Sequence, residues 1–334
     1  MTEPPPELQT AFPPPESPAR IRPPERPPLR IGLVQERWHP DPQEHEHALA
    51  VGIRIAADEG ATIVCLQELT LSRYFAITDD GPAAVGAEPE ELETGPTVRF
   101  AARLATECGI YVHASLYERA DGADGLGYNT AIVVSPEGRL VSRTRKLHIP
   151  ITAGYYEDHY FRPGPAEGDG DPYPVIALPF AGSSGDDAST TRLGCPTCWD
   201  QWFPELARAY SLAGAEVLIY PTAIGSEPDH PGFDTEPLWQ QVIVGNGVAN
   251  GTFMVAVNRI GVEEPITFYG SSFISDPYGR VLVQASRDRP AVLVADLDLD
   301  QRRDWLELFP LLTTRRPDAY ARLAAQPPLA SGSA

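Results

Sequence analysis

The sequence predicts an α/β protein built on a large mixed sheet, with two packed sheets as the alternative. Short β-rich runs alternate with helical stretches along most of the 334 residues. Predicted strands outnumber predicted helices, and several strands follow one another as in hairpins, which is typical of such sheets. With 42% apolar residues, about 300 residues can bury one large core or two smaller ones.

In the first half of the chain, the run 62–66 is continuously apolar, as expected of a strand buried on both faces. Gly109 suits a left-handed helix C-cap, and residues 136–139 suit a turn. The predicted strands here are 31–34, 62–66, 110–118, 130–134 and 140–148, and the predicted helices are 44–60 and 97–108.

In the second half, Pro196 falls inside a predicted strand, and because proline cannot donate a ladder hydrogen bond, that strand must be bulged or edge-like there. The predicted strands are 193–198, 216–220, 252–257, 271–275, 281–284 and 291–297, and the predicted helices are 204–213 and 237–249. The sequence contains no internal repeat and no glycine-rich phosphate loop, so nucleotide binding is not supported.

The two ends of the chain are predicted to be disordered. Residues 1–28 hold eleven of the 36 prolines and few large apolar residues, so they cannot bury enough surface to offset their ordering entropy. We expect a partly polyproline arm over 1–28, one domain over 29–323 and a flexible tail over 324–334.

Charge and cysteine content narrow the functional class. A formal net charge of -20 argues against nucleic-acid and membrane-surface partners and suits a cationic small molecule. No apolar run approaches the roughly 18 residues of a membrane span, and the N-terminus lacks a signal pattern, so we expect a cytoplasmic protein. Four cysteines are too few for a disulfide scaffold in a chain of this length.

Cys198 is the candidate nucleophile. It lies between a predicted strand and a helix with Pro204 in its first turn. Helix N-terminal amides there would favour the thiolate and stabilise an oxyanion. Three other interpretations stay open: a small buried hydrophobe, a redox pair with Cys195, and a zinc site, which would need two further ligands.

A nucleophilic cysteine needs a base and a donor for the developing oxyanion. Glu68 follows the apolar run 62–66, where partial burial would make its carboxylate a usable base. Lys146 lies near the end of the predicted strand 140–148. Each alone is more commonly a solvated charge, but the combination with Cys198 is more informative than any one of the three.

These three residues and their neighbours resemble the nitrilase, or carbon-nitrogen hydrolase, superfamily, which has Glu, Lys and Cys in this order. The resemblance runs from about Leu29 to Leu323. It implies that Glu157 is a second glutamate, structural or water-directing. The motifs that carry it are Leu66–Leu69, Arg145–Pro150, Gly154–Phe161 and Cys198–Glu205.

Further motifs are similar to the N-carbamoylputrescine amidase branch of that superfamily. The resemblance implies an α-β-β-α sandwich, a homo-oligomer (a dimer or larger) paired through its outer helices, no metal or organic cofactor, and release of putrescine, ammonia and carbon dioxide from N-carbamoylputrescine. The motifs are Tyr220–Pro228, Asn258–Gly261, Phe268–Phe273 and Arg315–Tyr320.

The mechanism expected from residue chemistry and resemblance is covalent. Glu68 takes the Cys198 proton, and Lys146 with the backbone N–H of Trp199 holds the oxyanion, leading to a thioester or thiocarbamate that water releases with help from Glu157. The alternatives are an amidase or a hydrolase of N-carbamoyl amino acids or β-ureidopropionate, a non-catalytic nitrilase-like binding protein, and a CxxC thiol protein.

A carbamoylated diamine would also need a partner for its distal ammonium group. Five acidic residues lie in predicted loops that could line the pocket mouth, and each alone is more commonly a solvated surface acid, so none is assigned to binding. They are Glu227, Asp229, Asp234, Glu263 and Glu264.

Overall fold

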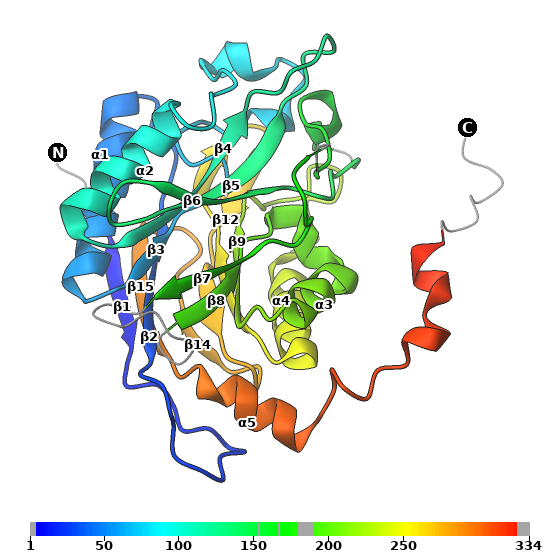
Figure 1. Cartoon of the computed structure of the whole chain (residues 1–334). Coiled ribbons are helices and arrows are strands. Elements are labelled where there is room, and N and C mark those ends of the chain that lie inside the picture. The colour runs from blue at the N-terminus through cyan, green and yellow to red at the C-terminus, as the bar shows by residue number, and fades with distance from the viewer. Residues whose placement is uncertain (1–4, 153, 166–167, 180–189, 326–334) are drawn as a thin grey trace.

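The computed structural model describes residues 5–152, 154–165, 168–179 and 190–325. Two β-sheets lie face to face, and helices cover the outer face of each, so that four layers follow one another as α-β-β-α (Figure 1). The predicted α/β class with packed sheets is therefore confirmed, as is the sandwich implied by the resemblance.

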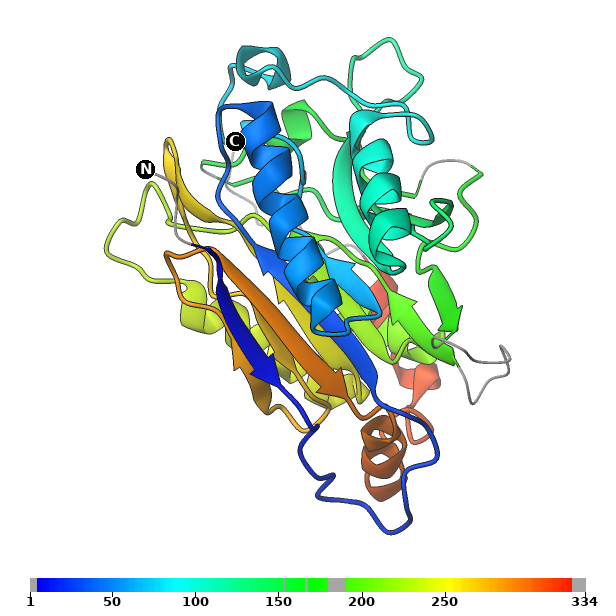
Figure 2. The same ribbon diagram turned by 90° about the vertical axis from the view of Figure 1, so that its left-hand side faces the viewer.

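The first layer pair is a seven-stranded sheet covered by helices α1 and α2 (Figure 2). Asp41 caps α1 by accepting two backbone N–H bonds, and Gly109 ends α2 in the predicted left-handed conformation. The strand order is β1 (Glu7–Ala11), β15 (Ala291–Leu297), β2 (Leu29–Gln35), β3 (Ile63–Cys65), β4 (Tyr111–Glu118), β5 (Tyr128–Val134) and β6 (Leu140–Arg145), with α1 at Pro42–Asp58 and α2 at Pro96–Cys108.

The second layer pair is a six-stranded sheet covered by α3 (Pro204–Leu212) and α4 (Glu236–Asn250). Its strand order is β14 (Val281–Gln284), β13 (Phe273–Ser275), β10 (Phe253–Val257), β9 (Val217–Pro221), β8 (Thr190–Gly194) and β7 (Val175–Pro179). The remaining elements are the hairpin β11 (Ile260–Glu263) and β12 (Ile266–Tyr269), helix α5 (Asp300–Leu308) and the 3₁₀ turns η1 (Phe75–Ile77), η2 (Pro82–Val85), η3 (Glu157–His159), η5 (Cys198–Trp202), η6 (Pro317–Ala319) and η7 (Ala321–Ala324).

The structure differs from the prediction mainly in short helices and strands. The strand predicted over 193–198 ends at Gly194, because Pro196 cannot donate a ladder hydrogen bond. The sequence analysis also missed β7, the hairpin β11–β12 and helix α5. Each of these has at most nine residues, which is too short for periodicity to show clearly.

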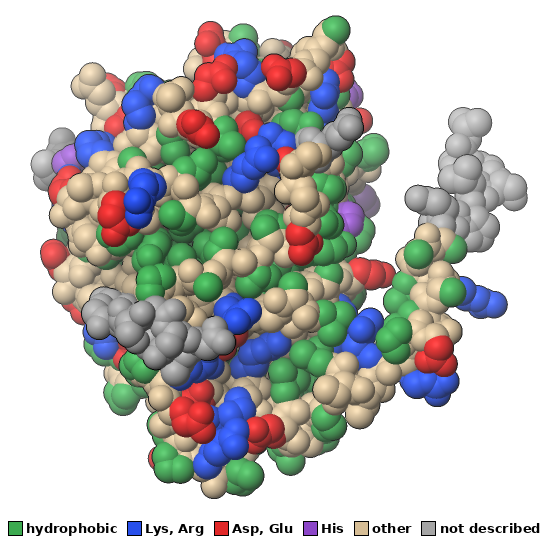
Figure 3. Space-filling view, viewed as in Figure 1, with side chains coloured by type: hydrophobic (Ala, Val, Ile, Leu, Met, Phe, Trp, Pro, Cys, Tyr) green, Lys and Arg blue, Asp and Glu red, His purple; other side chains and the backbone are tan. Residues whose placement is uncertain are grey.

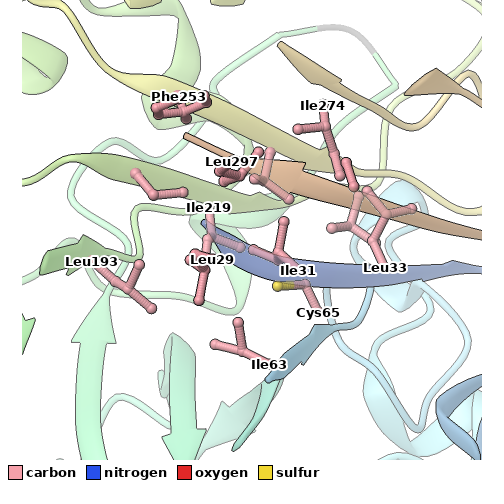
Figure 4. Packing of buried hydrophobic residues seen from close by; sticks show 14 of the residues in the cluster. Leu29, Ile31, Leu33, Ile63, Cys65, Leu193, Ile219, Phe253, Ile274 and Leu297 are labelled. Atoms are coloured by element: carbon pink, nitrogen blue, oxygen red, sulfur yellow. The ribbon is translucent and has the colours of Figure 1, made fainter. Parts of the chain in front are cut away.

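The central core lies between the two sheets. Figure 4 shows side chains of β2 and β3, such as Ile31 and Cys65, facing Ile219 of β9 and Phe253 of β10. One further apolar cluster lies between each sheet and the helices that cover it. This close packing gives the strand ends a rigid support on which side chains can be positioned.

The N-terminal segment corrects the prediction of a disordered arm over residues 1–28. Residues 7–11 form β1 beside β15 at the edge of the first sheet (Figure 2). Arg20 contacts Asp304 at 2.9 Å and Asp298 at 2.7 Å, and Arg26 pairs with Asp300 at 3.1 Å. Composition failed here because the segment needs no core of its own: ladder hydrogen bonds and ion pairs with distant residues stabilise it.

The predicted flexible tail at the C-terminus is not tested by the structure. The tail predicted over 324–334 lies outside the described residues except for its first two positions.

Among the described residues, no helix combines the length and apolarity needed to cross a membrane. Acidic and basic side chains are interspersed over the face shown in Figure 3.

We predict that trypsin cleaves the native protein slowly after Arg20 and that Asp304→Asn increases this rate several-fold. The Asp304 side chain is only 2% exposed in its pair with Arg20, so its loss leaves a partly buried guanidinium with a weakened partner. Glu307→Gln is the matched control, because its pair with Arg22 is about half-exposed and such surface pairs contribute little. Rapid cleavage of the unmodified protein would instead support a disordered arm.

Candidate active site

The structure brings the three predicted residues together at strand ends of different sheets. Glu68 lies three residues beyond β3 and Lys146 directly follows β6, both in the seven-stranded sheet. Cys198 lies four residues beyond β8 of the six-stranded sheet, as the first residue of η5. Glu157 joins them from η3. All four are buried, with at most 5% of their surface exposed.

Lys146 lies between the two carboxylates. Its Nζ donates to Glu68 Oε1 at 3.0 Å and contacts both carboxylate oxygens of Glu157, at 2.9 and 2.6 Å. Burial alone would lower the pKa of Lys146, but the charges of Glu157 and Glu68 outweigh it and raise this pKa well above its ordinary value. The side chain is therefore a permanent ammonium, as expected for an electrophile rather than a base.

Glu157 is a buried carboxyl group with a raised pKa. Burial and the charge of Glu68 raise the pKa of Glu157 to about 7, although Lys146 and the hydroxyl of Tyr74 act in the opposite direction. The Tyr74 hydroxyl donates to Glu157 Oε1 at 2.5 Å. Glu157 is thus held in place from two sides, by a cation and by a neutral donor.

Glu68 has one occupied and one free oxygen. Its Oε1 accepts hydrogen bonds from Asn129 Nδ2 at 2.7 Å and from Lys146. Its Oε2 is buried and has no hydrogen-bond partner among the described residues. A buried oxygen without a partner calls for a functional explanation, and this one remains available to accept a proton.

Cys198 lies on a tight, strained turn. Its φ of 40° is in the left-handed region, which a cysteine rarely adopts. The Asp200 carboxylate supports this turn by accepting the N–H of Thr197 at 3.1 Å and the N–H of His148 at 3.0 Å. Because Thr197 precedes Cys198 and His148 lies two residues beyond Lys146, Asp200 connects the segments that carry Cys198 and Lys146.

The thiol form of Cys198 is favoured at rest. Burial and the charge of Glu68 raise the pKa of Cys198 well above its ordinary value, and the opposing effects of Lys146 and the Ala223 backbone are smaller. This corrects the expectation that helix amides favour the thiolate. A resting thiol makes a base necessary, and the free oxygen of Glu68 is suited to that task.

Cys198 opens into a pocket of about 360 Å³. Glu157 and Glu227 are the two ionisable acids among its described lining residues, and no lysine or arginine lines it there. Apolar side chains make up most of the wall: Pro150, Trp199, Trp202, Ala223, Ile224, Phe233 and Leu238. A larger hollow of about 560 Å³ elsewhere contains neither Cys198 nor Glu157.

The five acids considered for a distal ammonium group separate clearly. Glu227 lines the pocket. Asp234 pairs with Arg287 at 2.7 Å and Glu263 with Arg259 at 2.7 Å, whereas Asp229 and Glu264 are exposed and absent from the pocket wall. Glu227 is therefore the candidate that the geometry favours.

Cys195 does not share the surroundings of Cys198. Its side chain packs in the apolar core between the sheets, while Cys198 faces the pocket, and both are free thiols. This arrangement weighs against a redox pair. Among the described residues, no group of three or more potential ligands is placed to hold a metal ion.

Sequence reasoning missed several residues that support the site. Arg259 lies within the motif Asn258–Gly261, but the supporting contacts of Asn129, Tyr74 and Arg259 had no local signal. They join each residue to Glu68 or Glu157, at least 61 positions away along the chain. Asp200 did carry one, since Thr197 and Asp200 have the spacing of a capping box at a helix start.

A four-layer sandwich with a buried thiol, ammonium and carboxylate pair defines the class of nitrilase-like hydrolases. The carbon-nitrogen hydrolase family model matches residues 30–307. The chain is 38% identical over 276 residues to the N-carbamoylputrescine amidase of Arabidopsis thaliana, covering 80% of this chain and 86% of that protein. It is 33% identical to a citrullinase of Francisella tularensis, covering 87% and 96%.

A solved structure agrees with these sequence matches. The carbon-nitrogen hydrolase from Helicobacter pylori G27 superimposes with a TM-score of 0.74 at 31% identity, covering 90% of this chain and 99% of that one. The protein belongs to the carbon-nitrogen hydrolase family.

We predict that Lys146→Met destabilises the fold by about 3–5 kcal/mol, since it leaves two buried carboxylates without their cation. In the variant, the pKa of Glu157, already raised to about 7 by burial, should rise further because the cation that lowers it is gone. The folded state then binds extra protons, so the loss of stability should be larger at pH 8 than at pH 5.

Denaturant unfolding at the two pH values measures this effect. The double variant Lys146→Met/Glu157→Gln is the control, because removing one carboxylate should restore part of the stability at pH 8. An equal loss at both pH values would contradict the role of Lys146 as the counter-ion of the cluster.

Proposed function

We propose that the protein is a cysteine-dependent amidohydrolase that converts N-carbamoylputrescine to putrescine, carbon dioxide and ammonia. The observation that carries this proposal is the distribution of charge in the Cys198 pocket. Glu157 is neutralised by Lys146, which leaves Glu227 as the acid without a cationic partner on the described wall. The apolar wall between suits a chain of methylene groups, and Glu227 suits an ammonium group.

In the first half of the reaction, Glu68 Oε2 accepts the Cys198 proton while the sulfur attacks the carbonyl carbon. The developing oxyanion accepts hydrogen bonds from Lys146 Nζ and from the backbone N–H of Trp199, a first-turn helix amide that has no acceptor one turn back. Glu68 returns the proton to the departing nitrogen, the carbon–nitrogen bond breaks, and ammonia leaves a thiocarbamate on Cys198.

In the second half, Glu68 takes a proton from water, whose oxygen attacks the thiocarbamate carbon. The carbon–sulfur bond breaks and the thiol regains its proton from Glu68. The released carbamic acid decomposes to carbon dioxide and putrescine. Glu157 holds Lys146 and helps to direct the water, because its carboxylate lies on the pocket wall.

The citrullinase relative makes an anionic or zwitterionic substrate the strongest rival. A substrate with a free carboxylate would need a cation in the pocket, and its charge would be repelled by Glu227. The described lining residues include no lysine or arginine. The pocket therefore favours a diamine derivative over N-carbamoyl amino acids.

The deciding experiment compares ammonia release from N-carbamoylputrescine, citrulline, β-ureidopropionate, glutamine and a simple nitrile, with Cys198→Ala as the inactive control. We expect cysteine-dependent release from N-carbamoylputrescine. Preference for citrulline or β-ureidopropionate would replace the substrate and keep the mechanism, whereas full activity of Cys198→Ala would refute the mechanism itself.

Within the same experiment, Glu227→Gln should raise KM for N-carbamoylputrescine roughly 10- to 100-fold, because a partly buried carboxylate that attracts the distal ammonium group is replaced by a neutral amide. The effect on kcat should be small. Asp229→Asn is the matched control, because Asp229 is two residues away and exposed. Equal behaviour of the two variants would exclude Glu227 as the ammonium partner.

We further propose that the protein is a cytoplasmic homo-oligomer paired through α3 and α4. Leu212 on α3 and Leu238 on α4 are each 47% exposed. Leu308 at the end of α5 is 57% exposed, and Phe309, which follows it, is 48% exposed. Residues 310–325 extend away from the body (Figures 1 and 3). Light scattering should give a dimer or larger, and Leu212→Glu/Leu238→Glu should lower the mass; a monomeric parent would contradict the pairing.

A further inference from the structure

Arg259 is a fully buried cation that the catalytic scheme does not use. It lies two residues beyond β10 of the six-stranded sheet, with 0% of its surface exposed. Its guanidinium reaches across to the loop after β3 of the other sheet. There Nη2 donates to the carbonyl oxygen of Glu68 at 2.6 Å and to that of Leu69 at 3.2 Å, and Nη1 donates to that of Ser72 at 3.3 Å.

The segment that Arg259 holds is strained. Leu69 has a φ of 46°, in the left-handed region that a leucine rarely adopts. Such a conformation persists only where the surroundings impose it. Arg259 binds the carbonyl oxygen of Leu69, and a second contact holds the N–H of Leu69, which donates to the Ser115 hydroxyl at 3.1 Å. The direction of the Glu68 carboxylate is coupled to this turn, because Glu68 immediately precedes it.

Glu263, the counter-ion of Arg259, connects the guanidinium group to Glu157 through Tyr74. Glu263 accepts Nη1 at 2.7 Å, and its other oxygen accepts the N–H of Tyr74 at 2.7 Å. The hydroxyl of Tyr74 in turn donates to Glu157. Burying an ion pair brings little net stability by itself, so its presence here is better explained by the carbonyl groups that the planar guanidinium fork can bind.

We propose that Arg259 is a positioning residue for catalysis: its guanidinium fork holds the strained Glu68–Leu69 turn and thereby directs the free oxygen of Glu68 toward the thiol of Cys198. The inference rests on the proposed role of Glu68 as the base. Arg259 itself does not line the pocket wall, and its proposed effect on the reaction passes through the Glu68 turn.

The test measures alkylation of Cys198 by iodoacetamide, followed on the Cys198 peptide by mass spectrometry, together with kcat and KM. Arg259→Lys keeps the charge beside Glu263 and loses the fork. It should lower kcat and the alkylation rate roughly 10- to 100-fold, as expected for a misplaced catalytic group, leave KM unchanged and displace the alkylation profile to higher pH.

Arg302→Lys is the matched control. Arg302 is partly buried and also donates to main-chain carbonyl groups, those of Asn250 at 2.8 Å, Gly251 at 2.9 Å and Ser211 at 3.1 Å, so it contacts α3 and the end of α4 rather than the site. It should lower the melting temperature without changing kcat or the pH profile. If Arg259→Lys behaves in the same way, Arg259 has a structural role only and the proposal is overturned.

A double-mutant cycle with Glu68→Gln separates this inference from the proposed function. If Arg259 acts through Glu68, Arg259→Lys should cause no further slowing of alkylation in the Glu68→Gln protein. Equal slowing in both backgrounds would overturn the inference. Unchanged turnover and alkylation in Glu68→Gln alone would instead refute Glu68 as the base, which is a failure of the proposed function.

Discussion

The buried ammonium of Lys146 between two carboxylates is the interaction on which the rest of the site depends. Two acids and one amine at 0–1% exposure are tolerable only because each contacts an opposite charge at 3.0 Å or less. The pairing keeps Lys146 protonated and leaves one oxygen of Glu68 free. Burial and the charge of Glu68 raise the pKa of Cys198, so the thiol form is favoured at rest.

The geometry of that cluster requires the two sheets to keep a constant relative position. Glu68 and Lys146 come from one sheet and Cys198 from the other. The apolar core between the sheets holds the sheets rigidly together, but it does not orient these polar side chains. Two buried polar side chains, Asp200 and Arg259, orient the segments that carry the site residues. Asp200 joins the segments around Lys146 and Cys198, and Arg259 joins the second sheet to the turn at Glu68. Both act on backbone groups, so both determine where a neighbouring functional side chain points.

Prediction succeeded where local pattern and physics coincide. The buried run at 62–66, the amphipathic helix near 44–60 and the C-cap at Gly109 all have signals within one turn or one strand, and the structure contains β3, α1 and the left-handed Gly109. It failed where stability comes from distant partners. The proline-rich N-terminal segment forms β1 because β15, nearly 300 positions away, supplies its ladder, and no composition argument contains that information.

The sequence alone determined the class of the protein. Glu68, Lys146 and Cys198 were candidates for a base, an oxyanion donor and a nucleophile, because those residue types are visible without coordinates. The resemblance of their motifs to known sequences indicated a carbon-nitrogen hydrolase. Only the tertiary structure decided the protonation state of the thiol, the choice of Glu227 among five acids and the roles of Asn129, Asp200 and Arg259. Those properties depend on burial and on contacts between residues far apart in the chain, which arise only when the two sheets pack together.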